Sequence, residues 1–413
     1  MIQFNRFKLE NGLHVIHHFD ATTPMAVVNT LYDVGARDES EEKTGFAHLF
    51  EHLMFGGSIN IPEFDTPLQN AGGENNAFTS NDITNYYDVL PVSNIETALW
   101  LESDRMLSLA FTEKSLEVQR SVVIEEFKQR YLNQPYGDVW LELRPLAYRE
   151  HPYKWATIGK NIEHIQDATM EDVKAFFKKY YNPSNAILCV AGNISLEETK
   201  RLVEKWYGDI PSGIKPERIL PLEPTQKEYR SKTIERAVPD AMSYFAFKMP
   251  ARKSVEYYIV DLISDAIGRD KSSVLSVKLM KEQQLVSSIN AYVLGSMDEG
   301  LFIISAKLLP NVSNKQFEEA LWKCLADYCS EGISEEETQQ LKLKIRTAKE
   351  FEDQSLLNRA MNLCLFELMG DANGINEENE IYQKINSVHL KEMAKKLLIQ
   401  ENCSVLHVIP QVK

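Results

Sequence analysis

The stretch Asn-Ile-Glu-Thr-Ala-Leu-Trp at residues 94–100 indicates how the chain folds, because a similar stretch occurs again much later. Residues 316–322 read Gln-Phe-Glu-Glu-Ala-Leu-Trp, and the two tryptophans are 222 positions apart. The same offset aligns residues 111–113, Phe-Thr-Glu, with residues 333–335, Ile-Ser-Glu. Agreement at one offset over about 50 residues is typical of an internal repeat, because chance similarity of amphipathic helices would not preserve the spacing.

Each copy of the repeat predicts a strand followed by helices. Residues 85–91 and 301–310 carry a strand signal. Thr112 and Ser334 each precede an acidic first turn, which is a common start of a helix. We therefore predict an α+β fold with two homologous mixed α/β domains, each an antiparallel-type sheet flanked by helices, facing each other across a cleft.

The join between the two copies lies where proline and glycine interrupt regular structure. Four prolines and Gly213 fall between Pro211 and Pro224, and such clusters predict a linker. The sequence thus predicts a first domain at residues 1–210, a linker at 211–230 and a second domain at 231–413.

Composition excludes some classes of function. The formal net charge is −15, from 45 Lys and Arg against 60 Asp and Glu. This balance argues against nucleic acid as a partner, because phosphate binding needs a basic surface. An acidic surface could attract basic peptides, or it could serve only solubility. No stretch approaches the roughly 20 apolar residues of a membrane span, so none is expected.

The N-terminal residues and the cysteines bear on the location of the protein and on the state of its thiols. The N-terminus lacks the features of a secretory signal, which predicts a cytoplasmic location, or a periplasmic one if a signal has been removed. The five cysteines form no Cys-x-x-Cys pair. This pattern favours buried free thiols over a disulfide framework or a thiolate zinc site.

Residues 48–52, His-Leu-Phe-Glu-His, carry the strongest chemical signal. His48 and His52 are four positions apart, so on a helix they project from one face. Two such imidazoles can each give a nitrogen to one zinc ion at about 2.0–2.1 Å, and Glu51 beside them could take a proton from water. Composition alone would produce this motif about 0.02 times in the chain. The alternative, a pair of buried structural histidines, would leave polar groups buried at a cost.

A catalytic zinc ion needs a third protein ligand and an open fourth position. The predicted helix at residues 118–128 offers the acidic pair Glu125 and Glu126. Spacing alone does not choose between them, and an acidic pair is usually a solvated helix face. The repeat aligns them with Thr347 and Ala348, so the shared scaffold requires neither carboxylate.

These motifs resemble the pitrilysin (insulinase) family of zinc metallopeptidases, and most of all its short bacterial members similar to mitochondrial processing peptidase. The resemblance runs through most of the chain and is densest from Asn11 to Asn193. Besides the histidine motif it rests on short matching pieces, which are Asn-Gly-Leu at 11–13, Gly-Ala-Arg-Asp-Glu at 35–39, Asn-Ala-Phe-Thr-Ser at 76–80, Thr-Asn-Tyr-Tyr at 84–87 and His-Pro-Tyr at 151–153.

The resemblance implies a zinc-dependent endopeptidase that hydrolyses oligopeptides or unfolded segments. It assigns His48, His52 and Glu126 as the ligands of one zinc ion and Glu51 as the base that activates water. It also implies that Asn76, Ala77, Phe78 and Thr79 form a strand that binds peptide by edge pairing, although an ordinary edge strand has the same pattern. Many members carry a further Glu where this chain has Gln119, so weaker support of the metal ligands is expected.

One departure from the family concerns the second domain. Active members usually carry an Arg and a Tyr seven residues apart there, and this chain has Met280 and Ser287 at the matching places. The resemblance then implies a heterodimer whose sister chain supplies the Arg and Tyr. A homodimer, or substitution by Lys278 or Lys281, is the alternative. A rival interpretation is a non-cleaving zinc- and peptide-binding or scaffold subunit of the same family.

Overall fold

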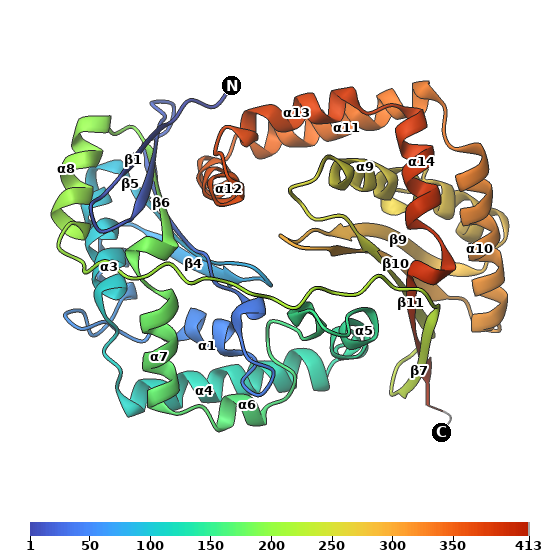
Figure 1. Cartoon of the computed structure of the whole chain (residues 1–413), viewed down its shortest axis with the longest axis horizontal. Helices are drawn as coiled ribbons and strands as arrows, with labels where there is room; N and C mark the ends of the chain where they lie inside the picture. The colour runs from blue at the N-terminus through green and yellow to red at the C-terminus, as the bar shows by residue number, and fades with distance from the viewer. Residues whose placement is uncertain (412–413) are drawn as a thin grey trace. The chain divides into compact units, whose positions relative to one another are not determined.

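The computed structural model describes residues 1–411, and their contacts divide the chain into two compact units (Figure 1). The first unit comprises Met1–Phe127, Trp155–Leu220 and Lys349–Glu377, and the second comprises Lys128–Lys154, Pro221–Ala348 and the residues from Glu378 onward. Within residues 1–411, no helix combines the length and apolar character that a membrane span requires.

The first unit is built on a six-stranded sheet in the order β1-β2-β6-β3-β5-β4. All neighbours are antiparallel except β2 and β6, which are parallel. The inner strand β6 is buried along its whole length because both faces of the sheet are covered. The strands are β1 (Asn5–Lys8), β2 (His14–Phe19), β3 (Met25–Tyr32), β4 (Glu74–Thr79), β5 (Thr84–Pro91) and β6 (Ala186–Gly192).

Helices cover both faces of this sheet. Val27 and Leu31 of β3 pack on α12, and the intervening Thr30 bonds to Glu102 of α3 on the opposite face. The alternation of side chains along a strand thus separates the two helical layers. The helices of the unit are α1 (Phe46–Leu53), α2 (Asp65–Asn70), α3 (Ile95–Leu107), α4 (Glu113–Phe127), α6 (Glu163–Gln166), α7 (Met170–Tyr180), α8 (Leu196–Tyr207) and α12 (Leu356–Met369).

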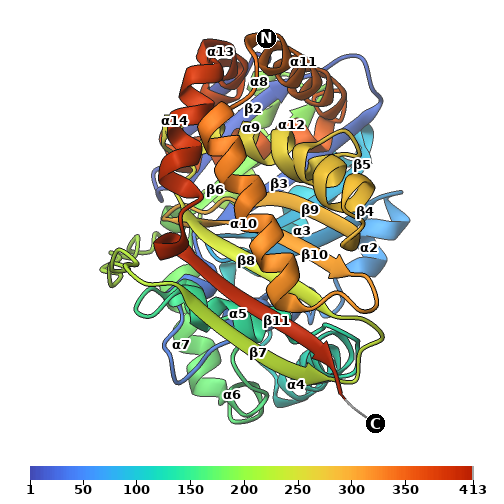
Figure 2. The same ribbon diagram turned by 90° about the vertical axis from the view of Figure 1, so that its right-hand side faces the viewer.

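The second unit has a five-stranded sheet in the order β7-β11-β8-β10-β9, with β7 and β11 parallel and the other pairs antiparallel. Its strands are β7 (Arg230–Arg236), β8 (Met242–Met249), β9 (Val286–Leu294), β10 (Gly300–Leu308) and β11 (Cys403–Pro410). Figure 2 shows α10 crossing in front of this sheet. The α-helices that lie wholly in this unit are α5 (Val139–Ala147), α9 (Val255–Ser264), α10 (Asn314–Glu331) and α14 (Ser387–Leu397), whereas α11 (Glu335–Glu352) and α13 (Gly374–Lys384) have residues in both units.

The order of elements repeats between the two halves of the chain, as the sequence predicts. The 222-residue offset takes the start of α4 at Glu113 to Glu335, where α11 (Glu335–Glu352) begins. In each sheet, the strand that comes last in the sequence lies parallel to an early strand, β6 to β2 in the first unit and β11 to β7 in the second. The α+β prediction is confirmed, with one parallel pair in each sheet added to the expected antiparallel pattern.

The compact units differ from the predicted continuous ranges because two helices are exchanged. α5 belongs to the first half of the sequence but buries Val139 and Leu143 against β10 and β11 of the second unit. α12 belongs to the second half but buries Ala360 and Leu363 on the sheet of the first. An apolar helical stripe predicts that a helix is buried, but it does not identify the sheet that receives it.

The predicted linker contains no helix or strand from residue 211 to 229. Within the first unit, the Arg218 guanidinium bonds to Asp33 and Asp38. Within the second unit, Glu223 accepts hydrogen bonds from the backbone N–H groups of residues 149–151 and from Lys248. The irregular segment is therefore fixed to each unit by a buried or half-buried charged group.

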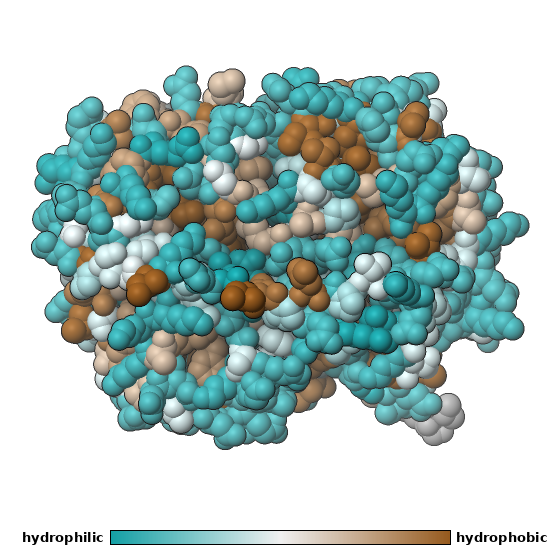
Figure 3. Space-filling view, viewed as in Figure 1, coloured by the Kyte–Doolittle hydropathy of each residue, from teal (hydrophilic) through white to brown (hydrophobic). Residues whose placement is uncertain are grey.

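The surface and the cysteines agree with expectation. Hydrophilic residues cover most of the face drawn in Figure 3, in keeping with the charge of −15. All five cysteines are free, and Cys329 alone among them is only partly buried.

Candidate metal centre

The helix α1 carries the histidine motif in its eight residues. Its buried side chains are Phe46, Ala47, Leu49, Phe50 and Leu53. His48, Glu51 and His52 are half-buried on the remaining face. Because the apolar side chains hold one face of α1 in the core, the three polar groups lie on the other side of the helix, and α1 packs against the helix α4 and the strand β4.

The start of α1 is fixed by glycine and by a carboxylate from outside the helix. Gly45 precedes the helix with φ of 87°, and a Cβ there would lie 2.7 Å from the carbonyl oxygen of Ile158. Glu39 is 9% exposed, and its two carboxylate oxygens accept hydrogen bonds from the N–H groups of Gly45 (2.9 Å) and Ala47 (2.8 Å). Burial raises the pKa of Glu39 to about 8, and these two donors oppose that rise.

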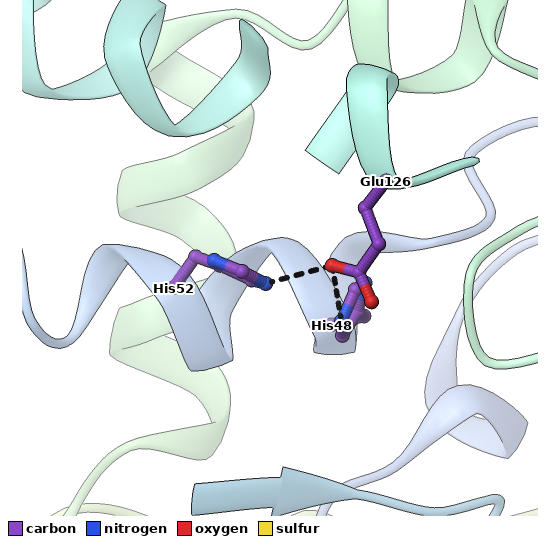
Figure 4. Close-up of side chains that lie close together, drawn as sticks. All are labelled: His48, His52 and Glu126. Atoms are coloured by element: carbon purple, nitrogen blue, oxygen red, sulfur yellow. Dashed lines mark ion pairs between the residues drawn. The ribbon is translucent and has the colours of Figure 1, made fainter. Parts of the chain in front are cut away.

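The helix α4 brings Glu126 to the same place. Val123 and Phe127 of α4 are buried, which leaves the Glu126 side chain facing α1. Its Oε2 atom lies 3.7 Å from Nε2 of His48 and 3.4 Å from Nε2 of His52 (Figure 4). One donor atom from each of the three residues lies within 4.8 Å of the others. The three residues could therefore hold a single divalent metal ion between them.

Of the acidic pair, only one member joins this cluster. Glu126 contributes its carboxylate, whereas Glu125 is exposed on α4. Gln119 lies two turns earlier on the same helix and is half-buried. The choice of Glu126, which spacing alone left open, agrees with the geometry.

Glu51 contacts the edge strand β4. The hydroxyl of Thr79 donates a hydrogen bond to Oε2 of Glu51, with 2.6 Å between the oxygens. Thr79 is the last residue of β4, which packs against α1. Sequence reasoning placed Thr79 among the peptide-binding residues and did not anticipate its bond to Glu51.

The strand β4 is the edge of its sheet and offers backbone groups. The N–H of Ser80 bonds to the carbonyl of Ile83 and closes the β4–β5 hairpin. Bonded and non-bonded pairs alternate from there along an antiparallel ladder, so the backbone groups of Ala77 and Asn75 point away from β5. The N–H of Ala77 instead bonds to the side-chain oxygen of Asn76 at 2.8 Å.

The exposed side chains of β4 lie on one face of the strand. Glu74, Asn76 and Phe78 are exposed, and the alternating residues are half-buried. Phe78 is 40% exposed. The four residues predicted to bind peptide thus all lie on an edge strand, and one of them contacts Glu51.

Met280 and Ser287, which stand where the resemblance leads one to expect an Arg and a Tyr, lie in the second unit. Met280 lies in the π-helical segment η7 (Ser276–Glu282) and packs against the core of that unit. Ser287 is exposed near the start of β9. Lys278, the alternative to the Arg, forms an ion pair with Glu282 at 3.2 Å.

Comparison with known proteins identifies the family of the chain. Residues 14–160 match the family described as Insulinase (Peptidase family M16), and residues 167–345 match the Peptidase M16 inactive domain. The zinc protease PqqE of Helicobacter pylori is 32% identical over 343 residues, which cover 81% of this chain and 77% of that protein. The mitochondrial-processing peptidase subunit beta of Saccharomyces cerevisiae is 26% identical, with 83% and 77% covered.

Solved structures share the fold. A protease from Helicobacter pylori superimposes with a TM-score of 0.93 at 27% identity, covering 99% of this chain and 100% of that chain. Pitrilysin matches with a TM-score of 0.78 at 19% identity, covering 99% of this chain and 45% of its own. From the two matched segments and the extent of the sequence similarity, the chain belongs to the insulinase family of peptidases, peptidase family M16.

Proposed function

We propose that the chain is a zinc-dependent endopeptidase in which His48, His52 and Glu126 hold one zinc ion and Glu51 is the general base. One observation carries the proposal, namely the convergence of two imidazole nitrogens and one carboxylate oxygen within 4.8 Å. Two His and one Glu form a donor set known from catalytic zinc sites with an open fourth position. Relatives named zinc proteases support the choice of metal.

The two distances from the Glu126 carboxylate to the histidine nitrogens suit zinc. Bonds of 2.0–2.1 Å in a tetrahedron place neighbouring ligand atoms roughly 3.3 Å apart. The Nε2–Oε2 separations of 3.4 Å and 3.7 Å lie close to that value. A bound zinc ion would supply Lewis-acid activation of a water molecule and of the scissile carbonyl.

Glu51 would move the proton in the reaction. It takes a proton from the attacking water as the oxygen of that water bonds to the carbonyl carbon, and it passes the proton to the leaving nitrogen as the C–N bond breaks. The products are a carboxylic acid and an amine, which ionise to a carboxylate and an ammonium group at neutral pH. The hydrogen bond from the Thr79 hydroxyl to Oε2 orients the Glu51 carboxylate for this role.

The edge strand β4 suggests the substrate class. An extended peptide can pair with the outward backbone groups of Ala77 and Asn75, and its carbonyl would replace Asn76 as the acceptor of the Ala77 N–H. Recognition through backbone groups needs an unfolded segment and reads few side chains. Oligopeptides and unfolded segments are therefore the proposed substrates.

A sister subunit belongs to the proposal. The family places of the Arg and Tyr hold Met280 and Ser287, and one relative is itself named a subunit. We expect the sister chain to supply the missing pair, and a homodimer is the alternative. The proposed location is the cytoplasm, and the periplasm is the alternative, since one protein of similar fold is the periplasmic protease PqqL from Escherichia coli.

A second candidate is a subunit that binds zinc and peptide without cleaving. Met280 and Ser287 favour it, because they remove two side chains that active members use. Two variants separate the candidates. Glu51→Gln should retain zinc by metal analysis and lose cleavage of a fluorogenic peptide, whereas the matched Glu125→Gln should retain both. Absence of cleavage by the wild-type chain, even together with its sister chain, would favour the binding subunit.

A further inference from the structure

Two backbone N–H groups at the N-terminus of α1 donate hydrogen bonds to one side chain, that of Glu39. The Oε2 atom accepts from the N–H of Gly45, and the Oε1 atom accepts from the N–H of Ala47. Glu39 is nearly buried, so water competes little for these bonds. An anion is favoured at this end of a helix by the free N–H groups and by the helix dipole.

The acceptor has to come from outside the helix. A helix usually begins with Ser, Thr, Asp or Asn, whose own side chain accepts from the first turn. At Gly45 the positive φ and the close Ile158 carbonyl exclude such a residue. The first turn of α1 also contains no acidic side chain. Glu39, six positions before Gly45, takes over the role of the missing cap.

The capped turn contains a residue of the candidate metal centre. His48 is the third residue of α1 and directly follows Ala47, whose N–H is bonded to Glu39. His52 lies one turn further on, where intrahelical bonds already hold the backbone. Fraying of the first turn would therefore move His48 relative to His52 and Glu126. We propose that Glu39 is a positioning residue that holds His48 in place for the metal, an inference that rests on the proposed zinc site.

Stability alone does not explain a carboxylate at this position. Because burial raises the pKa of Glu39 to about 8, folding favours the protonated form, and holding the carboxylate here has a stability cost that grows as the pH rises from about 4.5 and is complete above about 8. Neighbouring Asp38 acts in the same direction. Replacing Glu39 by Gln removes that cost and one acceptor together. The metal-free fold should then keep its stability while the first turn of α1 loosens.

The test compares Glu39→Gln with Glu42→Gln in the full chain at pH 7.5. Glu42 is an exposed glutamate of the same loop, so the control makes the same replacement of side chain away from the start of α1. We measure zinc affinity by competition with a chelator, thermal unfolding of the metal-free protein, and hydrogen–deuterium exchange of a peptide covering residues 44–50. Supporting residues around metal ligands change affinity by about 10–100-fold, and we expect a rise in Kd of about tenfold for Glu39→Gln.

The expected pattern is specific to positioning. Glu39→Gln should also speed exchange at the start of α1 while its metal-free unfolding temperature stays near that of the wild type, and Glu42→Gln should match the wild type throughout. Equal zinc affinity of Glu39→Gln and the wild type would overturn the inference. If Glu39→Gln does not fold, Glu39→Asp replaces it, because the shorter side chain keeps the carboxyl group but moves its oxygens away from the N–H groups. Unchanged zinc affinity of Glu39→Asp would likewise overturn the inference.

Failure of the zinc site itself would look different. In that case the wild-type chain would bind no zinc, which contradicts the proposed function. Hydrogen–deuterium exchange of residues 44–50 needs no metal, so it still tests whether Glu39 holds the start of α1. Unchanged exchange of residues 44–50 in Glu39→Gln would contradict that role.

Discussion

The Thr79 hydroxyl donates a hydrogen bond to the Glu51 carboxylate across 2.6 Å. This bond joins the edge strand β4 to the helix α1, so the strand proposed to bind peptide and the proposed base hold each other in place. A bond to a carboxylate is stronger than one between neutral groups. Pairing of a peptide with β4 would therefore be coupled directly to the orientation of Glu51.

Replacing Thr79 tests this coupling. Thr79→Val keeps the shape of the side chain but removes the donor, and we expect kcat to fall about tenfold, as a lost bond to a charged group implies. KM should change little, because the backbone edge of β4 stays. Thr79→Ser keeps the hydroxyl and should restore most of kcat. Steady-state kinetics with a fluorogenic peptide measure both constants, and equal kcat for Val and Ser would contradict the role of the bond.

The acidic pair on α4 offers a second test. Glu126→Gln should weaken zinc binding by about 100-fold, because a neutral amide replaces a charged ligand of the ion. Glu125→Gln changes the neighbouring, exposed carboxylate and should leave the affinity within about twofold. Competition with a chelator gives both values. Similar losses for the two variants would show that general charge, rather than ligation by Glu126, attracts the metal.

A third prediction uses the direction of backbone groups in β4. Ala77→Pro removes an N–H that points away from β5, so the ladder stays intact. We expect folding and zinc binding to persist while KM for peptides rises about tenfold, the effect of losing one or two peptide hydrogen bonds. Phe78→Pro removes an N–H that faces β5 and should instead lower the unfolding temperature. If Ala77→Pro leaves KM unchanged, peptides do not pair with this edge.

A fourth prediction concerns acid stability of the second unit. The Glu223 side chain is 3% exposed and bonds to Lys248 and to the backbone N–H groups of residues 149–151. Burial alone would raise the pKa of Glu223, but these donors outweigh it and lower the pKa to about 2. A lowered carboxyl pKa contributes stability above about pH 4.5 that is lost as the pH falls toward 2.

The lowered pKa of Glu223 predicts how a substitution changes stability at each pH. Glu223→Gln should lower the free energy of unfolding by about 2 kcal/mol at pH 7, and the difference from wild type should shrink between pH 4.5 and the lowest pH at which the fold persists. Chemical denaturation at a series of pH values gives the difference. Glu228→Gln, which changes an exposed residue of the same segment, should have little effect at any pH. A pH-independent loss in Glu223→Gln would point to packing instead.

Much of the fold was predictable because the chain repeats itself. The offset between Trp100 and Trp322 predicted two similar α+β parts, and the 48–52 motif predicted side chains on one helical face. Both inferences use local periodicity, which the backbone obeys without knowledge of tertiary contacts. The exchange of α5 and α12 was not predictable in this way, because either sheet can accept an apolar helix.

The contacts of Glu39 and Thr79 were missed for a related reason. Each joins segments that are separated in the sequence, Glu39 to the start of α1 and Thr79 to Glu51. One signal for Glu39 was nevertheless present. A helix that starts after glycine, with no acidic residue in its first turn, leaves N–H groups that require an acceptor from elsewhere, and Glu39 is a nearby acidic residue in a motif already noted.

The exchanged helix α12 sets the order in which the chain can fold during synthesis. The face of the first sheet formed by Val27 and Leu31 is covered by Ala360 and Leu363, which leave the ribosome long after β3. Until then that apolar face stays open to water and to other nascent chains. We therefore expect newly made first units to depend on chaperones, and truncation before residue 356 to yield aggregates rather than a smaller working peptidase.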